Sequence, residues 1–417
     1  MTASILFSVL GDPSNYKQVT YKIDKDKIPS YTSTKAICIS KKVEKTIVFV
    51  SFTLYHNLFQ DLPSSSYAEA TEKMKKAIKE KYDSLKDLTE ECKNVEFVIS
   101  PGVGTFVEQK DQRKIYRYKE KTSSDNEINL YFNHVYYTTF STISQYEKPQ
   151  VYVDLTHGIN YMPIVLYNVV NTALMAHGEG TAYFFNSDPF VGKYSEGIEL
   201  NVNEINSVNL RSNDSFNNVI LQFLSKEEEY YENIKDHYKI YKLAKAALAG
   251  VYILVFYHKK LINSALEEVK QELSQINNMK IDVKENNGEI EITYDYDLSM
   301  SYFLAHSLLH TLSKLVNYEK IDEYTIIEWE TRYSNPAIAE LLEYQISDII
   351  NKIRDGQWKN TTKGNLHNIE LRHYIAHAGL LNEIIHVKTD PSLKHIEEIE
   401  YKSLNLEKTL EDLLNLF

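Results

Sequence analysis

The chain has 417 residues, with 46 Lys and Arg against 58 Asp and Glu, and a formal net charge of −12. With 43% hydrophobic and 25% charged residues the composition excludes global disorder, and at about 150 residues per domain the length predicts two or three domains. The acidic balance excludes a protein that coats nucleic acid through its overall charge, so any contact with RNA or DNA must come from a local site.

Cysteine and arginine are both scarce. Cys38 and Cys92 are too few for a disulfide framework or a cysteine-rich metal site. The apolar run at residues 3–10 lacks a basic leader and other apolar stretches are too short to span a bilayer, so we expect a soluble, cytoplasmic protein with no membrane partner. Arginine, whose guanidinium forks onto phosphates, occurs six times, at Arg113, Arg117, Arg211, Arg332, Arg354 and Arg372.

The first half of the chain alternates extended runs with helical patterns, which predicts a parallel, doubly wound, Rossmann-like sheet. The stretch around Arg113 and Arg117 suggests a hairpin. The runs rich in β-branched and aromatic residues, expected to be strands, are 5–10, 18–23, 46–53, 95–100, 150–155 and 181–186. The segments with helical periodicity are 34–43, 64–88, 133–145 and 161–177.

Polar or glycine-rich runs follow three of these strands, at residues 11–15, 101–105 and 156–160. Ligands of doubly wound sheets bind beyond the carboxyl ends of the strands, so these runs are candidate binding loops. Asn160 is the expected N-cap of the next helix, with Pro163 in its first turn and Gly178 at its end.

The run at residues 154–160 (DLTHGIN) places hydroxyl, imidazole and amide groups in one strand-to-helix turn. Such a turn presents backbone N–H groups to phosphate, while Asn and Thr side chains can read base or ribose edges. The run matches neither the dinucleotide glycine pattern nor a P-loop. Simple turn chemistry is the alternative interpretation.

From about residue 215 the chain is mostly helical in period, apart from a β-hairpin candidate at 280–283 and 289–294. Asn and Ser cluster at residues 205–215. We therefore predict an α/β domain at residues 1–210 and a mainly helical domain at 211–417, with a possible hairpin insertion at 278–296.

The segment 371–379 (LRHYIAHAG) carries residues that can cut RNA without a metal. Histidine can accept or donate a proton near neutral pH when the ribose 2′-hydroxyl attacks its neighbouring phosphate, and arginine can stabilise the charge that builds on phosphorus. Arg372 and His377 are five residues apart, with the polar His373 between them.

Helix geometry complicates this pairing, because residues five apart differ by about 140° around a straight helix. Either the helix distorts near Gly379 or the pair converges with its copy from a second subunit, which we favour. Arg and His also occur this close by chance, and His373 and His377 have the spacing of a helical metal pair. His306 and His310 share that spacing, but on an apolar helix where a packing role is favoured.

Taken together, the motifs at 154–160 and 371–379 resemble the CRISPR-associated CARF–HEPN ribonucleases, the stand-alone effectors of type III systems. The resemblance covers nearly the whole chain and implies a CARF half that ends near residue 210, followed by a helical HEPN half. The HEPN motif consists of an arginine, a polar residue, a few variable residues and a histidine, matched here by Arg372, His373 and His377.

The resemblance implies an endoribonuclease activated by cyclic oligoadenylate, of which we favour cyclic tetra-adenylate because two-fold symmetry suits an even-numbered ring. A homodimer or higher oligomer would cut single-stranded RNA without a metal or other cofactor, leaving 2′,3′-cyclic phosphate ends. Arg372, His377 and His373 would form the nuclease centre. The residues carried over as messenger-binding are Gly11, Asn15, Thr53, Gly102, Thr105, Thr156, His157, Gly158 and Asn160.

Two other functions remain open. A nucleotide-sensing transcription regulator without nuclease activity would need a basic recognition helix, but basic residues at 227–241 and 351–363 are interleaved with acidic ones. A metal-dependent nuclease or phosphoesterase would use His306 and His310, or His373 and His377.

Overall fold

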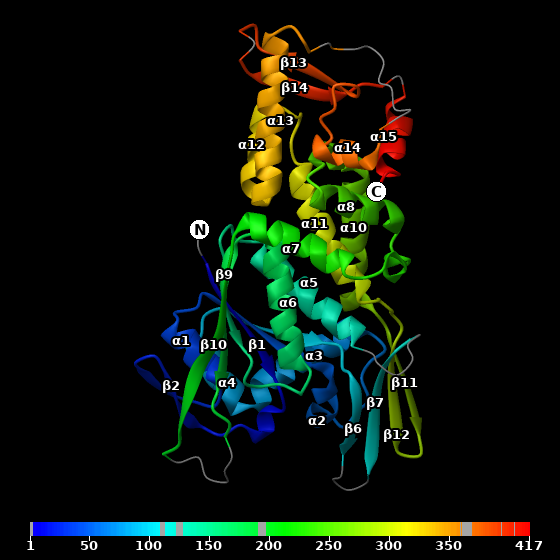
Figure 1. The fold of residues 1–417 in the computed structure, drawn as a ribbon. Helices are drawn as coiled ribbons and strands as arrows, with labels where there is room; N and C mark the ends of the chain where they lie inside the picture. The colour runs from blue at the N-terminus through cyan, green and yellow to red at the C-terminus, as the bar shows by residue number, and fades with distance from the viewer. Residues whose placement is uncertain are drawn as a thin grey trace. The chain divides into compact units, whose positions relative to one another are not determined.

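The computed structural model describes residues 3–108, 113–121, 128–190, 197–358, 360, 369–392, 394–403 and 405–417. The chain forms two compact units, which are coloured along the chain in Figure 1. Unit 1 consists of Met1–Leu210 together with Gln271–Phe303, and unit 2 of Arg211–Lys270 together with Leu304–Phe417. Among the described residues there is no helix with both the length and the apolar character needed to cross a membrane.

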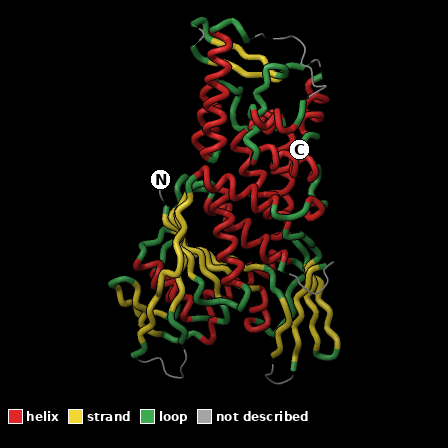
Figure 2. Tube along the Cα trace, in the orientation of Figure 1, coloured by secondary structure: helices red, strands yellow, loops and turns green. Residues whose placement is uncertain are grey.

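An eight-stranded sheet forms the core of unit 1, with its strands drawn in yellow in Figure 2. Its strands, in order across the sheet, are β3 (Asp26–Ser30), β2 (Val19–Ile23), β10 (Glu199–Leu210), β9 (Gly180–Ser187), β8 (Gln150–Asp154), β1 (Ser4–Leu10), β4 (Lys45–Ser51) and β5 (Val95–Ser100). The strands from β9 to β5 are parallel, which confirms the predicted parallel sheet, and β10 runs antiparallel to β9. β1 and β4 are buried along almost their whole length, as expected for strands covered on both faces.

Helices cover both faces of this sheet. They are α1 (Ser33–Ser40), α2 (Tyr55–Leu58), α3 (Tyr67–Lys81), α4 (Asp83–Glu91), α5 (Asn129–Ile143) and α6 (Met162–His177). The chain crosses the sheet from β1 through β4 to β5 and then returns to β8 and β9. Right-handed crossovers therefore place α1, α3 and α4 on one face and α5 and α6 on the other. Their contacts agree, because α4 packs against α1 and α3, and α5 packs against α6.

Two details of these helices differ from prediction. The single helix predicted at 64–88 is wrong, because the backbone is extended at Tyr82 (φ −112°, ψ 115°), which buries that side chain and separates α3 from α4. Asn160 is not the N-cap of α6, since Tyr161 occupies that position and no side chain caps the helix. Pro163 in the first turn and Gly178 at the end of α6 are confirmed.

A disulfide joins Cys38 of α1 to Cys92, the residue that follows α4, with their Cα atoms 6.1 Å apart. Both side chains are buried. Two cysteines 54 residues apart carry no spacing signal, so the sequence did not predict this bond.

A second sheet of unit 1 has the order β11 (Ile281–Asn286), β12 (Glu289–Tyr294), β7 (Lys114–Glu120) and β6 (Gly104–Glu108). Both predicted hairpins are present, β6 with β7 and β11 with β12. The second hairpin was expected as an insertion into the C-terminal domain, but its residues belong to unit 1, where β12 pairs in parallel with β7. This pairing gives the β12 edge the backbone partners that an isolated hairpin lacks.

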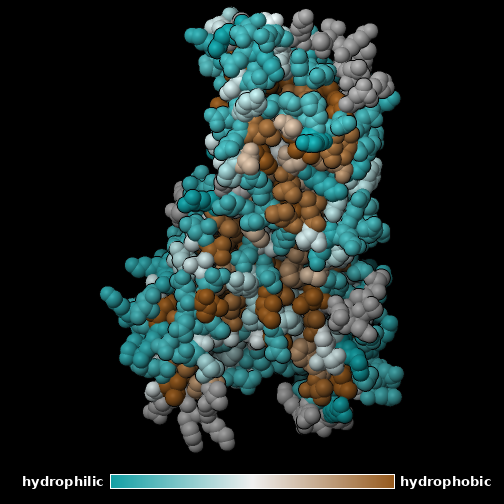
Figure 3. Space-filling view, viewed as in Figure 1, coloured by the Kyte–Doolittle hydropathy of each residue, from teal (hydrophilic) through white to brown (hydrophobic). Residues whose placement is uncertain are grey.

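Unit 2 is mainly helical. Its helices are α7 (Ser212–Leu224), α8 (His237–Leu248), α9 (Tyr252–Tyr257), α12 (Glu323–Tyr333), α13 (Pro336–Arg354), α14 (Leu371–Ala376) and α15 (Leu406–Leu414), with parts of α10 (Lys259–Gln275) and α11 (Ser301–Leu315). β13 (Ile385–Thr389) and β14 (Ile396–Tyr401) form a hairpin in a region read as helical from the sequence. Hydrophilic residues cover most of the face shown in Figure 3, as the acidic composition leads one to expect.

Candidate functional site

The strand order of unit 1 creates a binding edge. β1 pairs with β4 on one side and β8 on the other, so successive connections leave this point in opposite directions across the sheet. In doubly wound folds such a reversal opens a crevice at the carboxyl ends of the strands. The predicted runs at 11–15 and 156–160 follow β1 and β8 and therefore meet at this edge.

Asp154, the last residue of β8, holds the start of the 156–160 turn through its side chain. Its carboxylate is fully buried and accepts hydrogen bonds from Ser33 Oγ (2.7 Å), Thr34 Oγ1 (2.7 Å) and the backbone N–H of Thr156 (3.0 Å). A buried carboxylate is tolerated only when its oxygens are satisfied in this way. The result is a rigid link between α1 and the turn.

A hydrogen bond and a ring contact fix the orientation of the His157 imidazole in the same turn. Its Nε2 accepts the backbone N–H of Ser33 at 3.4 Å, and its ring lies 4.7 Å from the ring of Tyr16. Burial lowers the pKa of His157, and this effect outweighs the opposing influence of Asp154. The Tyr16 hydroxyl in turn accepts the N–H of Gly11 at 3.0 Å, so Tyr16 connects the 11–15 loop to the His157 ring.

Gly158 and Gly11 bring these loops into direct contact. Gly158 has φ +117°, and a Cβ there would lie 2.9 Å from Cγ2 of Val9. A Cβ on Gly11 would lie 3.5 Å from the backbone N of Gly158. The turn therefore needs glycine at 158 for both its backbone conformation and its packing.

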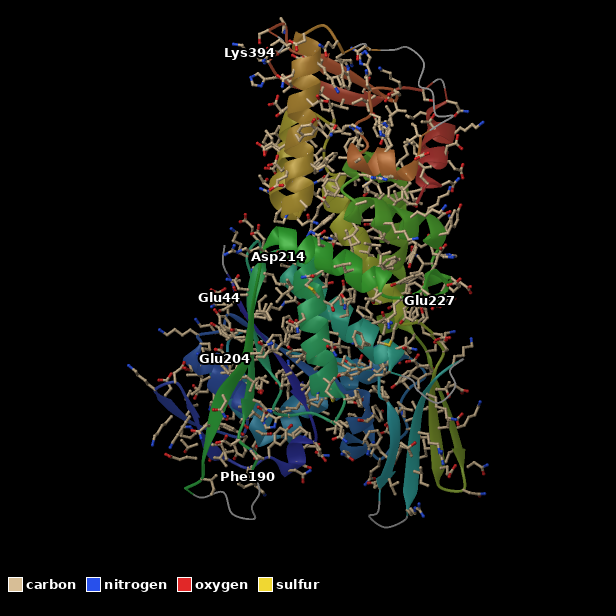
Figure 4. All side chains as sticks on the ribbon, in the orientation of Figure 1. Glu44, Phe190, Glu204, Asp214, Glu227 and Lys394 are labelled. Atoms are coloured by element: carbon tan, nitrogen blue, oxygen red, sulfur yellow. A yellow bond between two sulfur atoms is a disulfide. The ribbon has the colours of Figure 1, made fainter. Side chains whose placement is uncertain are left out.

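A pocket of about 560 Å³ opens beside these loops. Three of the predicted residues, Asn15, Thr156 and His157, line it, together with Tyr16 and Lys17. Phe190, labelled in Figure 4, lines it from beyond the end of β9. The remaining lining residues are Val19, Tyr21, Tyr31, Asn186, Ser187, Asp188, Pro189 and Leu200.

The sequence reasoning missed the contribution of residues 186–190. They follow the predicted strand 181–186 at the same edge, so the strand-end argument could have found them. They are tied to the predicted turn, since the N–H of Ser187 donates to Thr156 Oγ1 at 3.0 Å. Aromatic rings, amides and one lysine in a concave site suit a ligand with flat bases and phosphates.

Thr53 and Gly102 form a separate, buried cluster at the ends of β4 and β5. A Cβ on Gly102 would lie 2.9 Å from Cγ2 of Thr53 and 2.8 Å from Cδ1 of Tyr118. The Gly102 N–H donates to the Tyr294 hydroxyl at 2.7 Å. Neither residue lines the pocket.

The other two predicted ligand residues, Thr105 and Asn160, are exposed outside the pocket. Thr105 lies on β6 opposite Arg117 of β7. Asn160 lies just before the start of α6. The structure thus gathers the nine predicted residues into one loop pair, one buried cluster and two outlying positions.

In unit 2 the segment 371–379 forms a short helix that ends before its histidine. α14 closes at Ala376, and His377 is the C-cap residue, with φ −111° and ψ 15°. Ala378 (φ 49°) and Gly379 (φ 76°) then turn the chain sharply. The 140° separation expected on a straight helix therefore does not apply to Arg372 and His377.

Packing fixes this turn. A Cβ on Gly379 would lie 2.8 Å from Ile253 Cγ2, so only glycine fits there. Tyr374 is fully buried, and its hydroxyl hydrogen-bonds to that of Tyr401. The exposed face of α14 carries Arg372 and His373.

The polar groups of this segment form a compact set. The His373 and His377 rings lie 4.7 Å apart at 72°. His377 Nδ1 is 3.0 Å from Oε1 of Gln345, a residue that the sequence reasoning missed because nothing near it marks a site. Within the described part of the chain Arg372 has no acidic partner, whereas Arg117 pairs with Glu289.

The pKa of His377 is lowered chiefly by partial burial and next by the neighbouring His373 and Lys352, against the opposing influence of Glu383 and Asp348. A lowered pKa keeps the imidazole neutral at pH 7, the state that a general base needs.

The alternative metal pairs have different surroundings. His306 is fully buried, and burial lowers its pKa to about 3. Its ring lies 6.3 Å from that of His310. No group of three or more His, Cys, Asp or Glu side chains placed to hold a metal occurs among the described residues.

The parallel sheet of unit 1 is Rossmann-like, and comparison with known proteins shows what it resembles. Residues 5–189 match the family model of the CARF domain of the CRISPR system endoribonuclease Csx1. The chain is 25% identical over 454 aligned residues to the CRISPR system endoribonuclease Csx1 of Methanocaldococcus jannaschii, and the match covers 97% of this chain and 91% of that relative. The N-terminal part of the chain is thus similar to the CARF domain of Csx1, and the whole chain is similar to a CRISPR-associated CARF ribonuclease.

A solved structure, Enterococcus italicus Csm6 bound to cyclic hexa-2′-fluoro-hexa-dAMP, aligns over 100% of both chains with 11% identity and a TM-score of 0.31. A TM-score this low does not establish a common fold.

Proposed function

We propose that the protein is an endoribonuclease of type III CRISPR antiviral defence that cuts single-stranded RNA when cyclic oligoadenylate binds to it. In this proposal residues 1–210 sense the messenger and residues 211–417 form a HEPN nuclease domain. The working form is a cytoplasmic homodimer or higher oligomer that needs no metal or other cofactor. Two similarities support the proposal: residues 5–189 match the model of a CARF domain, and the relative that aligns with nearly the whole chain is named an endoribonuclease.

One observation carries the nuclease assignment: Arg372 is exposed, has no acidic partner among the described residues, and lies on the helix that ends at His377. His377 would accept the proton of a ribose 2′-hydroxyl as its oxygen attacks the adjacent phosphorus. Arg372 and His373 would stabilise the charge on the phosphoryl oxygens. The departing 5′-oxygen would take a proton from water and the His377 imidazolium would return its proton to the solvent, leaving a 2′,3′-cyclic phosphate and a 5′-hydroxyl.

The messenger would bind along the edge of the unit 1 sheet. The loops at Gly11–Asn15 and Thr156–Asn160 would offer backbone N–H groups to its phosphates, and the rings of His157 and Tyr16 would stack on an adenine. Thr53 and Gly102 would support this edge from their buried cluster after β4 and β5, and Thr105 would meet the messenger from β6, outside the pocket. We favour cyclic tetra-adenylate, because a two-fold dimer suits an even-numbered ring.

The nuclease test uses single-stranded RNA in EDTA, with cyclic tetra-adenylate, cyclic hexa-adenylate or no activator. Cleavage should require a ring and should survive the chelator. The Arg372→Ala/His377→Ala protein should not cut. Absence of cleavage with every ring, or equal cleavage by the double variant, would refute the proposal, and loss of cleavage in EDTA would favour a metal-dependent reaction.

Calorimetry with the activating ring tests the binding edge. His157→Ala should weaken binding about ten- to a hundredfold, because base stacking contributes roughly 1–3 kcal/mol. Asn160→Trp should also weaken it by crowding the rim. His395→Ala, which removes an exposed histidine of unit 2, is the matched control. Unchanged affinity in the His157 variant would contradict this placement of the messenger.

The second candidate function is a nucleotide-sensing transcription regulator without nuclease activity. The similarity to a CARF domain favours the regulator and the nuclease equally, because that domain binds the ligand and does not determine whether the protein cuts RNA or binds DNA. A gel shift with duplex DNA at low salt discriminates the two. DNA binding that responds to the ring, without RNA cleavage, would favour the regulator.

A further inference from the structure

One polar side chain interrupts the buried stripe of α13. The buried residues of this helix are Ile338, Leu342, Gln345 and Ile349. Their spacing of four, three and four is that of a single helix face packed on the core. Gln345 occupies a position where this pattern calls for an apolar residue, and only 3% of its surface is exposed. A buried amide at such a position needs a partner, because an unpaired one is costly.

That partner is the proposed general base. Gln345 Oε1 lies 3.0 Å from Nδ1 of His377. A carbonyl oxygen can only accept a hydrogen bond, so the proton between the two atoms belongs to Nδ1. In the neutral ring the lone pair is then on Nε2, the nitrogen that points away from Gln345.

We propose that Gln345 is a positioning residue that fixes His377 in the Nδ1–H tautomer and thereby makes Nε2 the atom that accepts the 2′-hydroxyl proton. This inference rests on the proposed nuclease function. An amide suits the task because it orients the ring without adding charge, whereas a carboxylate would stabilise the protonated imidazolium.

The charges around the ring allow this role. His373 and Lys352 lower the pKa of His377, whereas Glu383 and Asp348 raise it. His373 lies one turn back on α14, while Lys352 and Asp348 lie on α13 and pair with each other at 2.6 Å. Gln345 therefore gives His377 a neutral hydrogen-bond partner, while the neighbouring ionisable groups shift the pKa of His377 in both directions.

The primary test is a ¹⁵N NMR measurement of the His377 tautomer in the full-length protein labelled at histidine. A His377→Asn spectrum assigns the signal. In the unsubstituted protein Nδ1 should carry the proton. Gln345→Met, which keeps the volume and removes the acceptor, should shift the ring toward the Nε2–H form that free histidine favours. Ile349→Met, on the same buried stripe, should leave the tautomer unchanged.

An unchanged tautomer in Gln345→Met overturns the inference. If that variant does not fold, as judged by its melting transition, Gln345→Glu replaces it. The carboxylate should keep the Nδ1 proton and raise the pH at which His377 titrates. An unmoved titration in Gln345→Glu also overturns the inference.

Kinetics separate this inference from the proposed function. Gln345→Met should lower kcat for activated RNA cleavage about ten- to a hundredfold, the usual cost of losing an orienting hydrogen bond, with KM little changed. Gln345→Glu should move the acid limb of the pH–rate profile to higher pH. Absence of cleavage by the unsubstituted protein would refute the nuclease and leave the tautomer result intact, whereas full cleavage by Gln345→Met would refute the role of Gln345 alone.

Discussion

The binding edge of unit 1 and the α14 segment of unit 2 hold their polar residues in different ways. At the binding edge, Asp154 is fully buried beneath three hydrogen-bond donors, and His157 lies between the Ser33 N–H and the Tyr16 ring. In the α14 segment, Arg372 and His373 are exposed, and His377 lies 3.0 Å from the amide oxygen of the buried Gln345.

Because of this difference, substitutions in the two regions should affect different properties of the protein. Groups of the binding edge take part in the packing of unit 1, so changing them should alter both stability and ligand affinity. Arg372 contributes little to the fold, so its removal should change only the reaction. A preformed pocket suits a small ligand, whereas exposed cationic groups suit a flexible RNA strand that supplies the missing partners itself.

The largest expected effect tests the reactive side of this comparison. Arg372→Ala should lower the rate of activated RNA cleavage about 10²- to 10³-fold, because it removes the cation that we propose stabilises the developing charge. Its free energy of unfolding should stay within about 0.5 kcal/mol of the unsubstituted protein. Arg354→Ala, at another exposed arginine of unit 2, is the control and should cut normally. A destabilised Arg372→Ala protein would erase the distinction between the two regions.

Asp154→Ala tests the packed side and should cost about 2–3 kcal/mol of unfolding free energy, because three donors lose their acceptor in a buried place. Chemical denaturation measures this loss, and calorimetry should show weaker messenger binding as the 156–160 turn loosens. Asp154→Asn keeps one carbonyl acceptor, so its free energy of unfolding should lie between those of Asp154→Ala and the unsubstituted protein. Full stability of Asp154→Ala would mean that the turn does not depend on this carboxylate.

A smaller effect separates packing from backbone strain at the same turn. Gly158→Ala should cost about 2 kcal/mol, because both the positive φ and the contact with Val9 are unfavourable. Gly104 also has positive φ (+92°), but no described atom lies within 4 Å of an added Cβ. Gly104→Ala should therefore cost only about 1 kcal/mol. Equal losses in the two variants would show that Val9 yields without cost.

Much of unit 1 could be predicted because its signals are local. The strands 46–53 and 150–155 are runs rich in β-branched and aromatic residues, the second is followed by turn residues, and Pro163 and Gly178 bound one helix. The break at Tyr82 could not be predicted, because it depends on where that ring is buried. The pairing of β12 with β7 joins residues far apart in sequence, and no local pattern encodes such a partner.

The candidate sites show the same limit. Asn15, Thr156 and His157 were predicted because they follow strands, and all three line the pocket. Arg372 and His377 were predicted because their spacing matches a motif. Gln345 lies 32 residues before His377 within an ordinary amphipathic helix. Its significance comes only from the fold that brings α13 beside α14, as does the contact between Gly102 and Tyr294.

The smallest expected effect concerns the pH dependence of cleavage. Burial and the neighbouring His373 lower the pKa of His377 from its ordinary value of 6.5. A general base must be neutral, so cleavage should fall as the pH drops through this lowered pKa, and its acid midpoint should lie below 6.5. His373→Ala removes this neighbour, so the pKa of His377 should rise and the acid midpoint should shift to higher pH. A pH–rate profile of each protein measures the shift, and a midpoint that moves to lower pH would show that His373 supports the charged form of His377 instead of opposing it.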